Sequence, residues 1–405
     1  MKPKKKSSPT KAVKKDHREL GGELDLFSFH DISPGAAFWH PKGMLVFREL
    51  ERYAREINDQ EDYQEISTPI LTKKEVFERS GHWEHFRKNM FWFQNPADKK
   101  ETLVLKPMNC PESTYVYNSR IRSYKDLPLR LAEIGRLHRN ERSGTIGGLL
   151  RVRQITMDDA HIYIRPDQAE EEISKVLKII ENFYKGLDFK PQYYLATRPK
   201  SALGTKKEWD FAEEALRKAL QKNKIAFKIS EGEGAFYGPK IEVHIEDSQG
   251  RDWQLGTAQL DLVMLPDKFK LNYVDERGRK QKPFVIHRAI FGSFERFLGI
   301  LLEHFQGSLP FWLSPVQVTV LTLNDKILKY AEGVVKDLKE KNIRVELDSR
   351  NETISKKIRE AELQKIPYLL VIGEKEAKDK KIALRERGKG DIGQKTIEEF
   401  CKNLS

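Results

Sequence analysis

Apolar residues recur at helical spacing in several parts of the chain. Val46, Leu50 and Ala54 lie on one side of a predicted amphipathic helix. A strand follows at residues 63–71, and we expect Pro69 at an edge or interface, because proline cannot donate to a central ladder. The same spacing predicts further helices over residues 168–185, 207–222 and 285–305.

A second pattern, at residues 139–163, predicts a long antiparallel hairpin. It begins with Arg139 and Glu141, passes through a Ser/Gly-rich turn, and returns as a strand that carries Arg151. An arginine fork binds phosphate bidentately, and a carboxylate can accept from an exocyclic amine, so such a hairpin can hold a polyanion. Taken alone, an Arg-x-Glu pair is more typical of a solvated hairpin.

The last part of the chain, from about residue 313, alternates strands with helices. This β-α-β-α-β order predicts a separate domain with a mostly parallel sheet that helices cover. The strands are expected at residues 316–321, 343–348, 367–373 and 381–387.

Charge and composition add limits to this picture. The net charge is +12, and the first 18 residues hold eight Lys/Arg against Asp16 alone, so we expect a basic disordered tail that aids RNA affinity. The longest apolar runs have the length of strands, and we expect neither a membrane span nor a secretory leader. Cys110 and Cys401 are the only cysteines, which favours a reducing compartment, the cytoplasm.

The hairpin and its flanks carry a family resemblance. The strings LPLRLAEIGRLH, RNERSG, GLLRVR and DDAHIY resemble motif 2 of the class II aminoacyl-tRNA synthetases, above all the threonyl family. The helix and strand ending near Pro69 resemble motif 1, the homodimer interface in that family. Residues 285–305 resemble motif 3, in which Gly292 and Gly299 would flank Arg296 on one helix face and leave room for a nucleotide.

The resemblance implies an α+β fold with a class II antiparallel-sheet catalytic domain followed by an α/β anticodon-binding domain. We expect the basic tail at residues 1–18, the catalytic domain at 19–312 and the anticodon-binding domain at 313–405. The last domain is similar to the one that the threonyl, prolyl, histidyl and glycyl enzymes share.

The resemblance also implies an ATP site that works with Mg²⁺. Its arginines would neutralise charge on the transferred phosphoryl group, so positioning and electrostatics would carry the reaction. The implied ATP-binding residues are Arg139, Glu141, Arg151, Gln254, Thr257 and Arg296.

A zinc site is implied by Cys110, His161 and His287, although their spacing alone forms no zinc signature. One thiolate and two imidazoles leave a coordination position open, which is the catalytic pattern. We expect the start of a helix to favour the Cys110 thiolate. In the threonyl family the open position accepts the amine and hydroxyl of threonine, and Asp159 suits that hydroxyl.

His82 is the candidate for the aminoacyl-transfer step, and together with Arg139 and Arg296 it completes the expected catalytic set. Tyr237 and Gln259 match polar positions that line the substrate pocket. The implied anticodon-binding residues are Asn351, Arg359, Glu376 and Arg385, whose side chains can hydrogen-bond the exposed edges of single-stranded bases.

Two residues depart from the threonyl pattern. Ile155 stands where the family usually has a Phe that stacks on adenine, and Met157 stands where it usually has a Gln that contacts the amino acid's amine. Both changes remove a specific contact for ATP or threonine.

The leading hypothesis is a homodimeric threonine–tRNA ligase that acts on ATP, threonine and tRNA(Thr). The alternatives are a synthetase-like RNA-binding or regulatory protein without ligase activity, and a class II ligase for serine or proline. Only a lysine-rich tail precedes the predicted catalytic domain, so we expect no editing module and reliance on a separate trans-editing protein.

Overall fold

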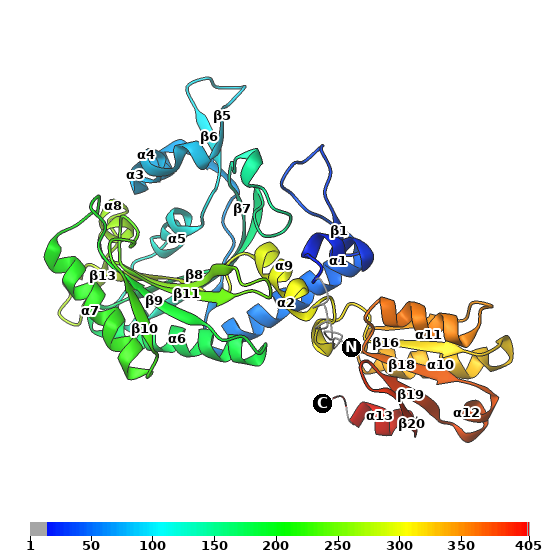
Figure 1. The fold of residues 1–405 in the computed structure, drawn as a ribbon. Helices are drawn as coiled ribbons and strands as arrows, with labels where there is room; N and C mark the ends of the chain where they lie inside the picture. The colour runs from blue at the N-terminus through cyan, green and yellow to red at the C-terminus, as the bar shows by residue number, and fades with distance from the viewer. Residues whose placement is uncertain (1–13, 403, 405) are drawn as a thin grey trace, which may run out of the picture. The chain divides into compact units, whose positions relative to one another are not determined.

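The computed structural model describes residues 14–402 and residue 404 (Figure 1). Contacts divide the chain into two compact units, the first comprising Met1–Ser28, Trp39–Val46 and Leu301–Ser405, and the second Phe29–Phe38 and Phe47–Ile300. These units do not coincide with the predicted domains, whose boundaries therefore stay a prediction. Most of the predicted basic tail, up to residue 13, lies outside the described residues.

The predicted tail ends too late in the sequence. Helix α1 (His17–Glu23) begins before residue 18, and the Asp16 carboxylate caps it by accepting from the backbone N–H groups of Arg18 and Glu19. His17 is buried, and its Nδ1 lies 2.7 Å from Oε1 of Glu303. The tail prediction is wrong for residues 17 and 18, because a capping aspartate and a buried ion-pair partner order them.

The second unit is built on an eight-stranded sheet with the order β10-β9-β11-β12-β15-β8-β7-β3. Only the pairs β3/β7 and β9/β10 are parallel, and all other neighbours are antiparallel. The strands are β3 (Gln64–Glu65), β7 (Leu129–His138), β8 (Gln154–Ile164), β9 (Gln192–Ala196), β10 (Phe227–Ser230), β11 (Lys240–Glu246), β12 (Asp252–Asp261) and β15 (Phe284–Ala289).

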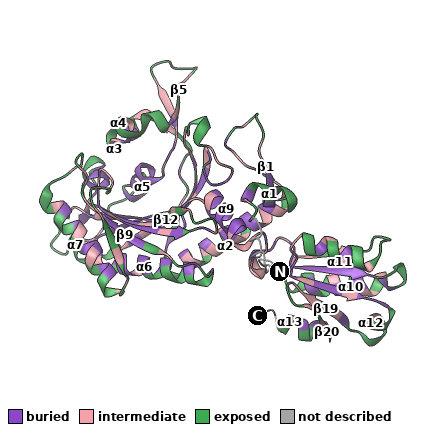
Figure 2. Cartoon of the chain, viewed as in Figure 1, coloured by how far each residue is buried: buried purple, intermediate pink, exposed green. Residues whose placement is uncertain are grey.

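The predicted antiparallel hairpin is present as β7 and β8, which pair from Leu129/Tyr163 to His138/Gln154. Its predicted bounds are wrong, because Arg139, Glu141 and Arg151 lie in the connection between the two strands. The predicted helices are also present as α2 (Pro41–Gln60), α6 (Ala169–Gly186) and α7 (Lys206–Lys222). Helices α6 and α7 pack side by side under one face of the sheet (Figure 1). Buried residues concentrate in the sheet and on the inner sides of these helices (Figure 2).

The helix predicted over residues 285–305 is wrong in its first part. Residues 284–289 form strand β15, whose side chains are buried on both faces, and α9 begins only at Phe294 (Phe294–Phe305). Gly292 lies in the turn before α9 with φ of 74°, and a Cβ there would lie 2.7 Å from the carbonyl oxygen of Leu255. A continuous apolar run fits a buried strand as well as a helix, and the sheet decides between them.

A smaller three-stranded sheet, with the order β4-β6-β5, stands beside α3 and α4 (Figure 1). Its strands are β4 (Leu71–Lys73), β5 (Phe91–Gln94) and β6 (Thr102–Leu105). The neighbouring short helices are α3 (Lys74–Ser80), α4 (His82–Phe86) and the 3-10 helix η1 (Arg87–Asn89). The other short elements are β1 (Phe27–Ser28), β2 (Phe38–Trp39), α5 (Cys110–Tyr117), α8 (Met264–Lys268), β13 (Tyr273–Val274) and β14 (Lys280–Gln281).

The C-terminal part of the first unit holds a five-stranded sheet with the order β17-β16-β18-β19-β20. The three strands β16, β17 and β18 are parallel, as predicted, whereas β19 and β20 are antiparallel additions. Strand β20 was not predicted, because its sequence GDIGQK has few apolar residues. The elements are β16 (Val318–Thr322), α10 (Leu328–Glu340), β17 (Val345–Asp348), α11 (Ile354–Leu363), β18 (Tyr368–Ile372), α12 (Glu374–Asp379), β19 (Ile382–Glu386), β20 (Gly390–Lys395) and α13 (Ile397–Lys402).

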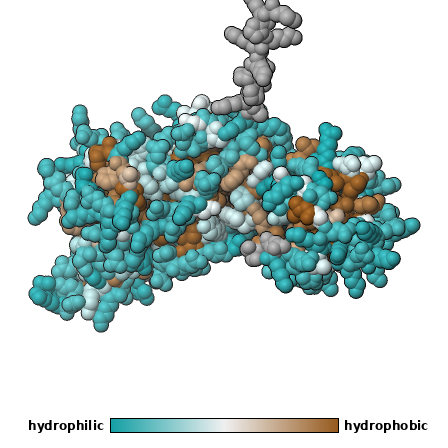
Figure 3. Space-filling model, turned by 60° about the horizontal axis from the view of Figure 1, so that its bottom comes forward, coloured by the Kyte–Doolittle hydropathy of each residue, from teal (hydrophilic) through white to brown (hydrophobic). Residues whose placement is uncertain are grey.

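Hydrophilic residues cover most of the face that Figure 3 shows, with separate hydrophobic patches between them. Among the described residues, no helix combines the length and apolar character needed to cross a bilayer.

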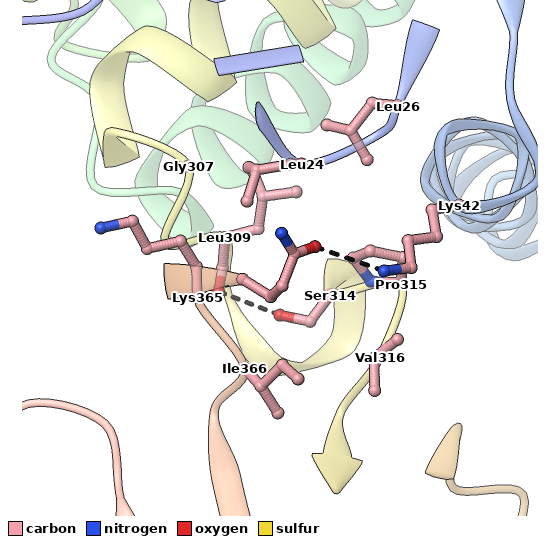
Figure 4. Close-up of a pocket in the computed structure, with 11 residues that line it drawn as sticks. Leu24, Leu26, Lys42, Gly307, Leu309, Ser314, Pro315, Val316, Lys365 and Ile366 are labelled. Carbon is pink, nitrogen blue, oxygen red and sulfur yellow. Dashed lines mark hydrogen bonds between the residues drawn. The ribbon is translucent and has the colours of Figure 1, made fainter. Parts of the chain in front are cut away.

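A small pocket of about 20 Å³ lies in the first unit, with room for about one water molecule (Figure 4). Lys42 closes it by donating from Nζ to Oε1 of Gln364 at 3.3 Å, and the Ser314 hydroxyl donates to the carbonyl oxygen of Leu309. It is too small for a substrate.

Candidate active site

The open face of the eight-stranded sheet carries two adjoining cavities, of about 560 and 220 Å³. They share one wall, formed by Arg139, Glu141, Met157, Gln254 and Thr257 together with Ala289. This wall draws on β8, β12, β15 and the loop after β7, so antiparallel pairing brings together residues that are far apart in the sequence.

Arg139 directly follows β7, and hydrogen bonds hold both its backbone and its side chain. Its backbone N–H donates to the carbonyl oxygen of Arg153, and its Nε donates to the carbonyl oxygen of Pro107 at 3.1 Å. Glu141 lies two residues on, with a carboxylate oxygen 3.6 Å from Nε of Arg151. The predicted ATP residues of the hairpin therefore lie on one rim of the cavities.

Arg296 lines the smaller cavity from the first turn of α9. Its Nε donates to the carbonyl oxygen of Leu150 at 2.9 Å, and its guanidinium lies 5.5 Å from the ring centroid of Trp253. Burial, followed by the positive charges of Arg139 and Arg151, lowers the pKa of Arg296. Positive charge thus converges on this cavity, as an anionic ligand requires.

Cys110, His161 and His287 come together although they lie far apart in the sequence. One ligand atom from each lies within 4.8 Å of the others, and all three residues are buried. No described residue hydrogen-bonds Nε2 of His161, whereas Nε2 of His287 lies 3.4 Å from a carboxylate oxygen of Asp261. An orphaned buried nitrogen beside a thiol and a second imidazole fits a metal ion such as zinc.

Cys110 begins helix α5, as predicted, but this position does not favour its thiolate. Burial raises the pKa of the Cys110 thiol well above its usual range, and the charges of Asp159 and Glu112 raise it further. Without a metal ion, desolvation therefore outweighs the few backbone N–H groups at the helix start, and the thiolate at Cys110 stays a prediction for the metal-bound site.

Asp159 lies on the wall of the larger cavity, close to the Cys/His cluster. Its Oδ2 accepts from Nδ2 of Asn109 at 3.1 Å. Burial raises the pKa of Asp159 to about 6, and the bond from Asn109 opposes that rise. Asn109 fits here because Gly135 faces it, and a Cβ on Gly135 would lie 2.4 Å from its Oδ1.

Two family models match the chain over most of its length. Residues 91–305 match the tRNA synthetase class II core domain (G, H, P, S and T), and residues 317–405 match an anticodon binding domain. The chain belongs to the class II tRNA synthetases. The predicted family and fold class are thereby confirmed.

Individual relatives point in the same direction. The chain is 49% identical over 393 residues to the threonine–tRNA ligase of Caldanaerobacter subterraneus subsp. tengcongensis, and 50% identical over 393 residues to that of Clostridium kluyveri. These alignments cover 97% of this chain but 60% and 61% of the relatives, so the chain spans about 60% of the length of the curated relatives it matches.

A solved structure extends the similarity to three dimensions. The RNA binding domain of the threonyl-tRNA synthetase from Cryptosporidium parvum Iowa II is 41% identical, with a TM-score of 0.90. The superposition covers 96% of this chain and 97% of that one.

His82, Tyr237 and Gln259 also line the larger cavity of this class II synthetase. The Tyr237 hydroxyl donates to Oε1 of Gln259 at 3.2 Å. His82 is almost fully buried, with Nδ1 2.8 Å from the Ser80 hydroxyl, and burial lowers its pKa to about 3. Its imidazole is therefore neutral across the physiological range.

The two departures from the threonyl pattern face the same cavities. Ile155 packs with Leu137 and Val152 and lines the smaller cavity, whereas Met157 lines both. The smaller cavity thus has an apolar side chain at Ile155, and both cavities have a thioether at Met157 where the family pattern has an amide.

Sequence reasoning missed two buried residues that hold this site. One is Asn109, which orients Asp159. The other is Glu295, whose carboxylate accepts from the backbone N–H of Thr156 at 2.9 and 3.1 Å and from the Ser293 hydroxyl at 3.0 Å. Glu295 thereby ties the start of α9 to strand β8 at Thr156, the residue between Ile155 and Met157. For Glu295, the only signal in the sequence was a carboxylate in a segment rich in phenylalanine.

The four predicted anticodon residues lie in the C-terminal domain. Asn351 and Arg359 are exposed, and Glu376 accepts from the backbone N–H of Gly373 at 3.0 Å and from Nε2 of Gln394 at 2.7 Å. Arg385 is half-buried on β19; its Nη2 lies 3.7 Å from Oε1 of Glu362, and its Nε has no hydrogen-bond partner among the residues that the structure describes. A buried N–H without a partner costs free energy unless a ligand satisfies it.

Proposed function

We propose that this synthetase is a threonine–tRNA ligase. The observation that carries the proposal is the pair of adjoining cavities: three arginines suited to a nucleotide line the smaller one, and Cys110, His287 and Asp159, suited to an amino acid, line the larger one. The names of its relatives support the same activity. A protein that only bound RNA would need neither the convergent arginines nor the buried ligand cluster.

In the first step, the carboxylate of threonine attacks the α-phosphorus of ATP, and pyrophosphate leaves; bound Mg²⁺ would help to neutralise the phosphate charge. Arg139 and Arg296 neutralise the charge that develops on the phosphoryl oxygens, and Arg151 meets the outer phosphates. Glu141 accepts from the adenine amine. No protein group forms a covalent bond, so positioning and electrostatics supply the rate.

The amino acid is selected by Cys110, His161 and His287, which would hold a zinc ion, and by Asp159. Bound zinc would coordinate the amine and hydroxyl of threonine. Valine has a similar shape but no hydroxyl, so it would leave Asp159 without a donor. Asn109 keeps the Asp159 carboxylate aimed at the hydroxyl.

In the second step, the terminal ribose hydroxyl of tRNA attacks the threonyl carbonyl and AMP leaves. We assign His82 to this step, since its neutral imidazole can accept a hydrogen bond from the attacking hydroxyl. A pKa of about 3 makes it a weak base, so its main contribution is orientation. Tyr237 and Gln259 hold the other polar groups of the threonyl-adenylate that the first step forms.

At the other end of the tRNA, we assign Asn351, Arg359, Glu376 and Arg385 to the anticodon. This assignment accompanies the proposed division into a catalytic domain at residues 19–312 and an anticodon-binding domain at 313–405.

We also propose a homodimer that works in the cytoplasm. The small sheet presents an apolar face, where Leu71 and Phe93, each 43% exposed, lie on the strands that flank β6. An exposed apolar sheet face beside the expected motif 1 suits a second copy of the chain.

The test of the proposal is ATP–pyrophosphate exchange with each of the amino acids in turn. Threonine should support exchange far better than any other. Exchange with proline or serine as the best substrate would replace threonine in the proposal, and no exchange with any amino acid would favour an RNA-binding protein.

Serine should support measurable exchange. It shares the amine and hydroxyl of threonine and lacks one methyl group, a difference worth about 10–200-fold in kcat/KM when binding alone discriminates. Parallel exchange assays with serine, threonine and valine measure this. The seryl ester would then have to be hydrolysed, in this protein or by the separate deacylase that we expected. Discrimination beyond about 1,000-fold would contradict this account of the pocket.

Replacing Arg385 with alanine should raise the KM for tRNA while leaving exchange unchanged. Loss of one base-reading arginine costs about 1–3 kcal/mol, or roughly 5–150-fold in affinity. Lys389→Ala is the matched control, since Lys389 is exposed on the same hairpin and pairs with Glu386. If Arg385→Ala lowered exchange and charging equally, the assignment of this residue to the anticodon would be wrong.

A further inference from the structure

An arginine lies between two tryptophans on the small three-stranded sheet and its neighbouring helix. The guanidinium carbon of Arg87 is 5.1 Å from the ring centroid of Trp83 and 4.9 Å from that of Trp92. The two indoles meet edge to face at 5.7 Å. We call these three residues the Trp–Arg cluster.

The cluster is anchored on one side and open on the other. Trp83 packs against a small core of Phe77, Met90 and Val104. Trp92 is 41% exposed, and Arg87 is exposed as well. Indole and guanidinium planes are therefore held in place and presented to solvent, so little side-chain entropy would be lost on binding.

Two cations at this surface are unpaired within the described part of the chain, whereas Lys74, 5.7 Å from the Trp83 ring centroid, pairs with Glu78. Among the described residues, neither Arg87 nor the adjacent exposed Lys88 has a carboxylate partner within ion-pair distance. Fixed aromatic faces beside unpaired cations are what single-stranded nucleic acids bind, because bases stack on the rings and phosphates meet the cations.

The cluster and the larger cavity draw on neighbouring residues of one helical segment. Helix α4 and turn η1 place His82, Phe86 and Asn89 on the cavity wall, and the intervening residues Trp83 and Arg87 in the cluster. A chain that leaves the cavity across this helix therefore meets the cluster next.

We propose that the Trp–Arg cluster binds the unpaired 3′ end of the RNA as it enters the cavity. A base stacks on Trp92, and Arg87 meets a neighbouring phosphate. This inference rests on the proposed function, in that an RNA 3′ end must reach the cavity.

The experiment uses the whole chain and a hairpin RNA with an unpaired 3′ tail, compared with the same hairpin with a blunt end. The tailed hairpin should quench tryptophan fluorescence. Trp92→Ala should weaken its binding by roughly 5–150-fold, Trp92→Phe should largely restore binding, and the blunt hairpin should not distinguish these variants. Arg87→Gln should lower the slope of log affinity against log salt by about 0.7.

Phe211→Ala is the matched control, because Phe211 is 45% exposed but lies on α7, under the other face of the large sheet. It should bind both hairpins like the unaltered protein. Equal losses for tailed and blunt hairpins in Trp92→Ala, an unchanged salt slope in Arg87→Gln, or a change in oligomeric state with unchanged RNA affinity would each overturn the inference.

ATP–pyrophosphate exchange, which needs no RNA, separates this inference from the proposed function. Exchange should be unaltered in Trp92→Ala, and a loss there would reveal a structural role and overturn the inference. If the unaltered protein showed no exchange but bound the tailed hairpin through Trp92, the proposed function would fail while the RNA site stood.

Discussion

Replacing Arg296 with alanine should reduce threonine-dependent ATP–pyrophosphate exchange by at least about 100-fold while the protein stays folded. Removing a single fixed group that stabilises transition-state charge typically costs about 100–1,000-fold. Arg296 lines the smaller cavity, where its Nε is held by the carbonyl oxygen of Leu150, and the apolar side of α9 does not depend on it. Exchange kinetics with a thermal melt of each variant measure the effect.

Two further variants sharpen this test. Arg296→Lys keeps a charge but loses the planar fork, so it should recover only part of the activity. Arg136→Ala removes an exposed arginine from β7 outside both cavities and should have no effect. Near-normal exchange in Arg296→Ala would remove this residue from the ATP site.

Replacing Cys110 with alanine should abolish zinc binding and with it the activation of threonine. The unaltered protein should hold about one zinc per chain, because the three ligand atoms converge and no residue in the described part of the chain bonds His161 Nε2. Loss of the thiolate leaves two imidazoles, which bind zinc far more weakly. Metal analysis of protein purified without chelators reads this directly.

Cys401→Ala is the matched control for this variant. Cys401 is the only other cysteine, and it lies on α13 in the C-terminal domain, so its replacement should leave the zinc content unchanged. Zinc that persists in Cys110→Ala, or its absence from the unaltered protein, would refute the metal site. Cys110→Ser should also lose the metal, because a serine hydroxyl rarely ionises to become a ligand.

Together, these experiments divide the protein's chemistry by location. Arg296 tests the nucleotide role proposed for the smaller cavity, Cys110 tests the amino-acid role proposed for the larger cavity, and Arg385 tests the proposed recognition of RNA by a separate domain. Asn109 and Glu295 hold parts of the wall without facing the substrates directly, so their variants should alter several of these readouts together.

The sequence by itself determined much of this protein. Helical spacing located α2, α6 and α7, the charged hairpin became β7 and β8, and alternation located the three parallel strands of the C-terminal sheet. These features depend on local periodicity, which can be read directly from the sequence. Short strings such as DDAHIY carried the family, and through it a set of candidate residues, most of which the fold brings to two adjoining cavities.

Only the tertiary structure decided the rest. His287 lies on a strand instead of a helix because neighbouring strands on both sides pair with it, and no local pattern contains that fact. Burial, which many distant residues produce together, raises the pKa of Cys110 and lowers that of His82. Long-range pairing and desolvation are properties of the folded chain, so the convergence of the ligands, the protonation of the site and the Trp–Arg cluster had to come from the structure.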